Sequence, residues 1–371
     1  MLVRRTTALV AAVAAAAAAT LLSACASSPP PAPSAPSAPS APASSAEAPA
    51  TALAAKTPSA TTPSAQSTSS TAPSTAAPAT MANAAPKPPV DAARVAAATG
   101  GKPETTDNVV KVSFPRTERV DIAGYQKFPA FMGLTSWAGF TPGEKAGVEA
   151  MVMGDFVLFE DEVESAMSAA IDNGLEVTAL HNHFFFDKPH VYFMHIGGEG
   201  SVEQLGKGVK AMIDVQHAVR QKSAQVATSF GPAAPPSPSK IDGAKLDAVF
   251  GIKGQAKDGM YKATMGRKAQ AACGCTVGKA MGVNTWAAFG GTDESAVVDG
   301  DFAVAESELQ PVLKALRGGG INVVAIHSHM TGESPRILFL HYWGQGKAAD
   351  LASVVKRALD LTAWDGRAQS T

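Results

Sequence analysis

Alternation of apolar and polar positions predicts short strands and helices from about residue 91 onward. The segments whose pattern predicts strands are 108–114, 119–123, 137–140, 151–159, 175–184 and 190–196. Apolar positions at helical spacing predict helices over 91–99, 163–171 and 201–215. Because strands and helices are mixed without strict alternation, we expect an α+β fold with helices packed on a mostly antiparallel sheet.

The whole pattern occurs twice, which predicts an internally duplicated domain. The Gly-Asp-Phe triplet at 154–156 returns at 300–302, and Trp137 returns as Trp286. We therefore place a first repeat at 91–219, a Pro/Ser/Gly-rich linker at 220–239 and a second repeat at 240–364.

The N-terminal region has a different composition. Residues 1–25 have two arginines followed by an alanine-rich apolar run, as in a signal peptide. The run ends in Leu22-Ser23-Ala24-Cys25, which resembles the lipobox of bacterial lipoproteins. This resemblance implies a lipid on Cys25, attachment to a membrane and a location in the bacterial cell envelope. Residues 26–90 are mostly Ala, Pro, Ser and Thr, so we expect a disordered tether.

Charge and cysteine content exclude several classes of function. The formal net charge is −1, and no basic patch interleaved with aromatics follows residue 100, so a nucleic-acid partner is not expected. Three cysteines provide no disulfide framework. Cys273 and Cys275 stand two residues apart, a spacing that suits either a soft metal ion or a local disulfide.

Histidines are concentrated at equivalent places in the two repeats. We expect a hairpin centred on Pro189, and another centred on Pro335, whose histidines all point to one face of the sheet. In this register His183 is directly opposite His195, and His329 is opposite His341. The six histidines are His181, His183, His195, His327, His329 and His341.

Three converging imidazoles suit a divalent transition metal such as Zn²⁺, Cu²⁺, Fe²⁺ or Ni²⁺. Carboxylates could complete or orient such a site, and the candidates are Glu160, Glu162, Glu199, Glu306 and Glu308. A site for an unknown small ligand and a buried hydrogen-bonded network remain alternatives to metal binding. Whether the protein is an enzyme, such as a metal-dependent hydrolase or oxidoreductase, stays open. We assign Asp155 and Asp301, each preceded by glycine, to turns at strand starts.

The segments LHNHFFFDKPHVYFMHIGGEG and GDFVLFEDEV, together with the two-copy arrangement, resemble the LppY/LpqO family of bacterial lipoproteins, a domain of unknown function (DUF1259). The resemblance covers roughly residues 90 to 365. It implies no catalytic residues, and only His181, His183 and His195 match its recognisable motif. The second copy departs from the motif at Ser328, Met330 and Arg336.

Overall fold

The computed structural model describes residues 87–231 and 233–366. The predicted signal peptide with Cys25 and all but the last residues of the predicted tether lie outside these ranges. The described residues belong to one compact unit. Within the described ranges, no helix combines the length and the hydrophobicity needed to span a membrane.

Both repeats build the same succession of helices and long strands, and they differ only in their two-residue strands. In the first repeat these are α1 (Ala92–Thr99), β1 (Pro103–Thr106), β2 (Val109–Pro115), β3 (Asp121–Ile122), η1 (Ala130–Met132), β4 (Thr135–Pro142), β5 (Ala150–Phe159), α2 (Glu160–Asp172), β6 (Glu176–His181), β7 (Asp187–Lys188), β8 (Val191–Gly200) and α3 (Val202–Lys222). In the second repeat they are α4 (Gly243–Phe250), β9 (Gln255–Lys257), β10 (Met260–Gly266), β11 (Ala269–Gln270), β12 (Thr276–Val277), η2 (Lys279–Met281), β13 (Asn284–Gly291), β14 (Ala296–Ala305), α5 (Glu306–Gly318), β15 (Asn322–His327), β16 (Ile337–Gly346) and α6 (Ala348–Leu359).

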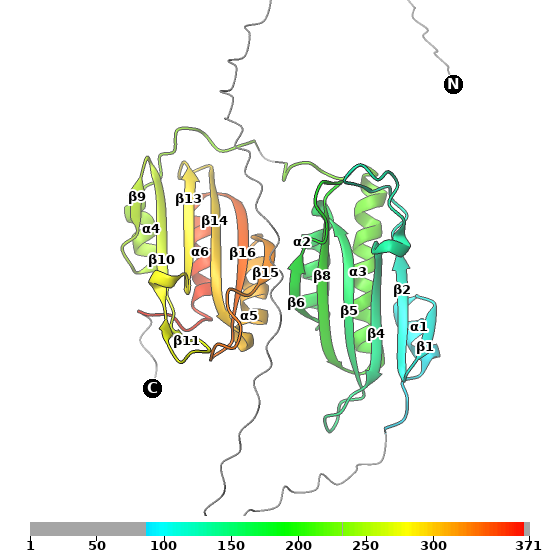
Figure 1. Cartoon of the computed structure of the whole chain (residues 1–371). Coiled ribbons are helices and arrows are strands. Elements are labelled where there is room, and N and C mark those ends of the chain that lie inside the picture. Colours follow the sequence, from blue (N-terminus) through cyan, green and yellow to red (C-terminus); the bar gives the residue numbers. More distant parts are fainter. Residues whose placement is uncertain (1–86, 232, 367–371) are drawn as a thin grey trace, which may run out of the picture. The chain divides into compact units, whose positions relative to one another are not determined.

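Twelve of the described strands form one sheet in the order β1-β2-β4-β5-β8-β6-β15-β16-β14-β13-β10-β9. All of its pairings are antiparallel, so the predicted α+β fold with internal duplication is confirmed. Helices cover one face of the sheet in each repeat (Figure 1), and the main core lies between helices and sheet. The two outermost strands, β1 and β9, are short and carry exposed polar residues, which discourages further edge pairing.

Local signals set the helix boundaries. Asp91 accepts a hydrogen bond from the Ala93 N–H at the start of α1, and Gly100 ends this helix in the left-handed conformation. Ser201 caps α3 by accepting a hydrogen bond from the Gln204 N–H. The α3 helix continues to Lys222, seven residues beyond the predicted end, and Arg220 in this extra part forms ion pairs with Asp161 and Glu162.

The predicted register of the histidine hairpins is wrong. His195 lies opposite Ala179 rather than His183, and His341 lies opposite Ala325 rather than His329. The first strand of each hairpin ends at His181 or at its counterpart, and the following loop leaves the sheet. The loop of the first repeat supplies β7, which pairs with β3 instead of forming a tight turn at Pro189. Since the register shifts by four residues, an even number, the histidines keep the face that the sequence predicts.

The repeats meet where β6 and β15 form an antiparallel bridge between Leu180 and Ile326. Away from this bridge, side chains of the helices satisfy the strand edges. Glu164 of α2 accepts a hydrogen bond from the Val323 N–H at 3.0 Å. Gln310, its counterpart on α5, accepts from the Val177 N–H at 3.1 Å and donates to the Val177 carbonyl at 2.8 Å. We call this junction the seam.

A buried ion pair recurs at the N-terminus of α2 and of α5. The Arg116 guanidinium donates to both carboxylate oxygens of Glu162, which also accepts from the Phe159 N–H. Glu162 is fully buried, and the guanidinium also donates to the Val157 carbonyl. Arg267 and Glu308 repeat the arrangement. Such two-pronged pairs fix orientation as well as charge.

The glycine of each Gly-Asp-Phe triplet is required by a cross-strand neighbour. A Cβ on Gly300 would lie 2.2 Å from the Tyr342 ring, whereas a Cβ on Gly154 would lie 3.1 Å from the Ile196 side chain and 2.7 Å from the Trp137 carbonyl. We predict that Gly300→Ala lowers the free energy of unfolding by about 3 kcal/mol, and that Gly154→Ala lowers it by about half as much. Urea unfolding of the two variants measures the difference. Equal losses of unfolding free energy in the two variants would show that the Tyr342 ring is not the reason for glycine at position 300.

Candidate functional site

A row of three side chains crosses the face of the sheet that points away from the helices. Trp137 on β4 is paired with Asp155 on β5, which is paired with His195 on β8. The second repeat has Trp286, Asp301 and His341 at the same register positions. Residues directly opposed across strands lie on the same face, close enough for their side chains to interact. Both aspartates therefore lie within strands and face the histidines, and their assignment to turns is wrong.

The histidines of the first repeat gather at the end of this row. The His181 ring stacks on the His195 ring, with ring centres 5.1 Å apart and planes within 4°. The His183 ring centre lies 5.2 Å from that of His181, and the His183 ring stacks on the buried ring of Phe193, with centres 3.9 Å apart. The three imidazoles thus form a row with His181 in the middle, and His183 lies past the end of β6.

The second repeat reproduces the cluster with small differences. The ring centres of His327 and His341 are 4.7 Å apart, and His329 stacks on Phe339 with centres 3.4 Å apart. The Nε2 atoms of His327 and His329 approach to 3.1 Å. Phe339 corresponds to Phe193, so each cluster rests on a buried phenyl ring.

Burial shapes the protonation of these groups. It lowers the pKa of His181, His327 and His329, and the neighbouring imidazoles lower it further. Neutral rings, which have a free nitrogen lone pair, are therefore favoured. Burial also raises the pKa of Asp155, against the opposing effect of His195. It raises the pKa of Asp301 to about 7, with a further contribution from the Asp299 charge.

Each aspartate has an unsatisfied oxygen. Among the described residues, Asp155 Oδ1 and Asp301 Oδ1 are buried without a hydrogen-bond partner, and so is His327 Nδ1. The Asp301 Oδ1 atom lies 3.9 Å from Nδ1 of His341, which is too long for a hydrogen bond. Buried polar atoms of folded proteins are nearly always paired, so unpaired ones beside a histidine cluster indicate capacity for an additional ligand.

The glutamates proposed to support the histidines lie in other environments. Glu162 and Glu308 are occupied by their arginines at the helix N-termini. Glu199 pairs with Lys145 at 2.7 Å, and the Glu306 carboxylate lies 3.9 Å from the Arg336 guanidinium. Glu160 is exposed and lines a cavity at the seam. The carboxylates that pair directly with a clustered histidine across the strands are Asp155 and Asp301. In the sequence, the repeated Gly-Asp-Phe triplet marks these two aspartates.

Two further observations concern metal chemistry. No set of three or more His, Cys, Asp or Glu side chains within the described ranges is arranged to hold a metal ion as it stands. Cys273 and Cys275 are exposed free thiols on the loop between β11 and β12. The side chain of Cys275 lowers the pKa of the Cys273 thiol.

The fold and site define a class: a duplicated α+β protein with a histidine cluster on the helix-free sheet face of each repeat. The chain matches the family described as Domain of Unknown Function (DUF1259) over residues 93–215 and 244–361. It belongs to that family. Comparison with curated proteins found no matching sequence.

Among solved structures, the chain has weak similarity to shell proteins of bacterial microcompartments. A trimeric bacterial microcompartment shell protein, PduB, is 13% identical with a TM-score of 0.19, covering 70% of this chain and 89% of that chain. EtuB from Clostridium kluyveri is 10% identical with a TM-score of 0.19, covering 70% and 88%. Likeness at this level carries no argument about function.

The raised pKa of Asp301 predicts a pH-dependent stability. Its folded-state pKa of about 7 exceeds the ordinary 3.8, so the folded state holds the proton more tightly than the unfolded state does. The contribution of this proton to the free energy of unfolding is therefore fully present below about pH 4 and is lost as the pH rises through 7. We expect Asp301→Asn to gain about 2 kcal/mol of unfolding free energy relative to the parent between pH 5 and pH 8. Urea unfolding at both pH values tests this.

The matched control is Asp155→Asn. The opposing charge of His195 limits the pKa increase of Asp155, so this variant should gain less over the same interval. If the difference in unfolding free energy between Asp301→Asn and the parent did not change with pH, the raised pKa of Asp301 would be wrong.

Proposed function

We propose that the protein is a lipoprotein of the bacterial cell envelope, anchored through a lipid on Cys25, that binds a divalent transition metal ion at its histidine clusters. The observation that carries metal binding is the second cluster, where the Nε2 atoms of two histidines approach each other and the third histidine faces an unsatisfied carboxylate oxygen of Asp301. The lipid anchor is supported by the sequence Leu22-Ser23-Ala24-Cys25 after an apolar run.

The separation of the His327 and His329 nitrogens suits a shared ion. With metal–nitrogen bonds of about 2.0–2.1 Å, two ligands are about 2.9 Å apart at a right angle and about 3.4 Å apart at the tetrahedral angle. The Nε2–Nε2 distance of 3.1 Å lies between these values. A hydrogen bond between one protonated and one bare Nε2 atom would also fit this distance, so metal analysis is needed to distinguish them.

A complete site requires one further movement. The His341 ring stacks on His327, and its side chain would have to turn toward the same point. Rotation about the terminal histidine torsion has a broad range, and this side chain is only half-buried. Asp301 is placed either to supply an oxygen ligand or to orient His341 through Nδ1.

Elemental analysis of the full chain, purified without a histidine tag and equilibrated with Zn²⁺, tests metal binding. We expect up to two equivalents, one for each cluster, and the loss of one equivalent in His327→Ala because this ring contacts both other histidines of its cluster. His217→Ala is the control, since His217 lies on α3 away from both clusters. Less than about a tenth of an equivalent in the parent protein, unchanged in His327→Ala, would refute the proposal.

The membrane anchor is tested separately. We expect Cys25→Ala to move the protein from the membrane fraction to the soluble fraction of lysed cells, because the thiol that carries the lipid is absent. Immunoblotting of the separated fractions measures this. Cys273→Ala, which removes an exposed thiol of the folded region, should leave the distribution unchanged. Retention of Cys25→Ala in the membrane fraction would disprove the anchor.

A further inference from the structure

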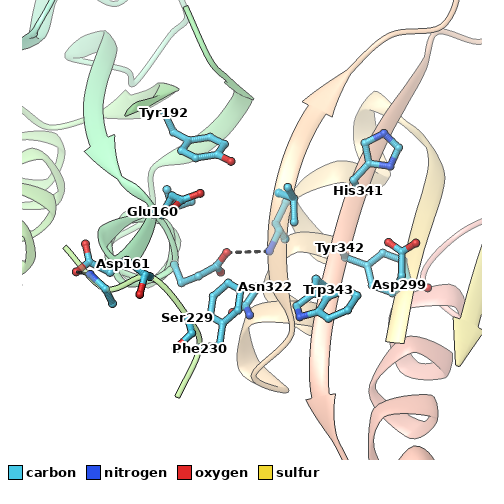
Figure 2. A pocket seen from close by; sticks show the side chains of 16 residues that line it. Glu160, Asp161, Tyr192, Ser229, Phe230, Asp299, Asn322, His341, Tyr342 and Trp343 are labelled. Atoms are coloured by element: carbon cyan, nitrogen blue, oxygen red, sulfur yellow. Dashed lines mark hydrogen bonds between the residues drawn. The ribbon is translucent and has the colours of Figure 1, made fainter. Parts of the chain in front are cut away.

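A cavity of about 610 Å³ opens at the seam. Figure 2 shows Glu160 and Tyr192 of the first repeat on one side and Asp299, His341 and Trp343 of the second on the other. The cavity exists because β6 ends at His181, while the antiparallel strand β15 extends past that end with residues 322–324. Residues 227–230, which follow α3, complete the wall.

Aromatic side chains form much of this wall. Tyr192 and Trp343 come from strands of the two repeats, and Phe230 comes from the segment after α3. Tyr342 also lines the cavity, but its side chain is fully buried. Trp343 is half-buried, and Phe230 is 58% exposed. Aromatic rings at such positions offer apolar area and negatively polarised faces, which attract cations.

The charged residues of the cavity are acidic. Its carboxylates belong to Glu160, Asp161, Glu164 and Asp299, and no lysine or arginine is among the residues that line it. Asp161 and Glu164 are neutralised by Arg220 and Arg317. Within the described ranges, Glu160 and Asp299 have no ion-pair partner. Asp299 is directly opposite Trp343, so a carboxylate stands beside the indole.

The fold does not require these residues. The equivalent positions on the other side of the seam hold Leu338 for Tyr192, Met153 for Asp299 and Gly197 for Trp343. The same strands and helices form there without the aromatic or acidic groups. Their presence on one side therefore points to a ligand rather than to folding.

We propose that the seam cavity binds a small organic cation with an alkylated ammonium group, held by Asp299 and Trp343. The ammonium group lies over the indole face beside the carboxylate, and the apolar body of the ligand contacts the other aromatic rings. Of the proposed metal ligands only His341 lines this cavity, and cation binding there requires no metal.

Calorimetric titration of the full chain with choline tests the site. Its neutral isostere, 3,3-dimethylbutan-1-ol, differs only in lacking the charge. We expect saturable binding of choline with a Kd of about 1 mM or tighter, and at least tenfold weaker binding of the alcohol. Equal binding of the two, or no saturable binding of choline in this range, would overturn the proposal.

Variants locate the binding and separate it from metal binding. Asp299→Asn removes an exposed charge without disturbing the core, and Trp343→Gly reproduces the residue of the other repeat. Each should weaken choline binding at least tenfold, while Met153→Ala, at the counterpart of Asp299, should not. Asp299→Asn should keep its zinc content, and His329→Ala should keep its choline affinity. Unchanged choline affinity in Asp299→Asn would refute the site whether or not zinc binds.

Discussion

The antiparallel contact of β6 with β15 is the constraint on which the rest of the structure depends. Each strand would otherwise be the exposed edge of a sheet in its own repeat, with unpaired N–H and C=O groups beside a core of Val and Leu. Direct pairing covers only the region around Leu180 and Ile326. Where the strands diverge, Glu164 and Gln310 act as substitutes for a neighbouring strand. One junction thus joins two six-stranded halves into a single sheet and leaves the cavity beside it.

The sequence predicted the properties that depend on periodicity. Alternation predicted the strands, the repeat predicted the duplicated α+β fold, and parity predicted that His181, His183 and His195 share a face. Register could not be predicted, because it depends on where β6 ends and on the pairing of its following loop with β3. The role of Asp155 was also hidden, since the residue beside it in space, His195, is forty positions away along the chain.

Acidic residues have divided roles that their spacing does not reveal. Glu162 and Asp155 both belong to the segment GDFVLFEDEV. The carboxylate of Glu162 is paired with Arg116, whereas Asp155 faces the histidines. The arginine comes from a distant strand end, so no local pattern indicates the pair. A bidentate guanidinium satisfies the first carboxylate, whereas the second keeps an unpaired oxygen. A carboxylate whose oxygens are all hydrogen-bonded has a structural role, whereas one that keeps an unpaired oxygen is a candidate for ligand binding. Residue type alone does not distinguish the two.

The order of strands in the sheet reads the same from either edge, as it would in a symmetric dimer of one repeat. In such a dimer the interface is isologous, so every substitution appears on both sides at once. A residue that binds a ligand on one side of such an interface would then also occupy the equivalent position on the other side, and the structure there would have to accommodate it. Joining both copies in one chain removes this coupling. Trp343 can thus stand at a position where the first repeat keeps Gly197, and the two sides of one interface can evolve independently.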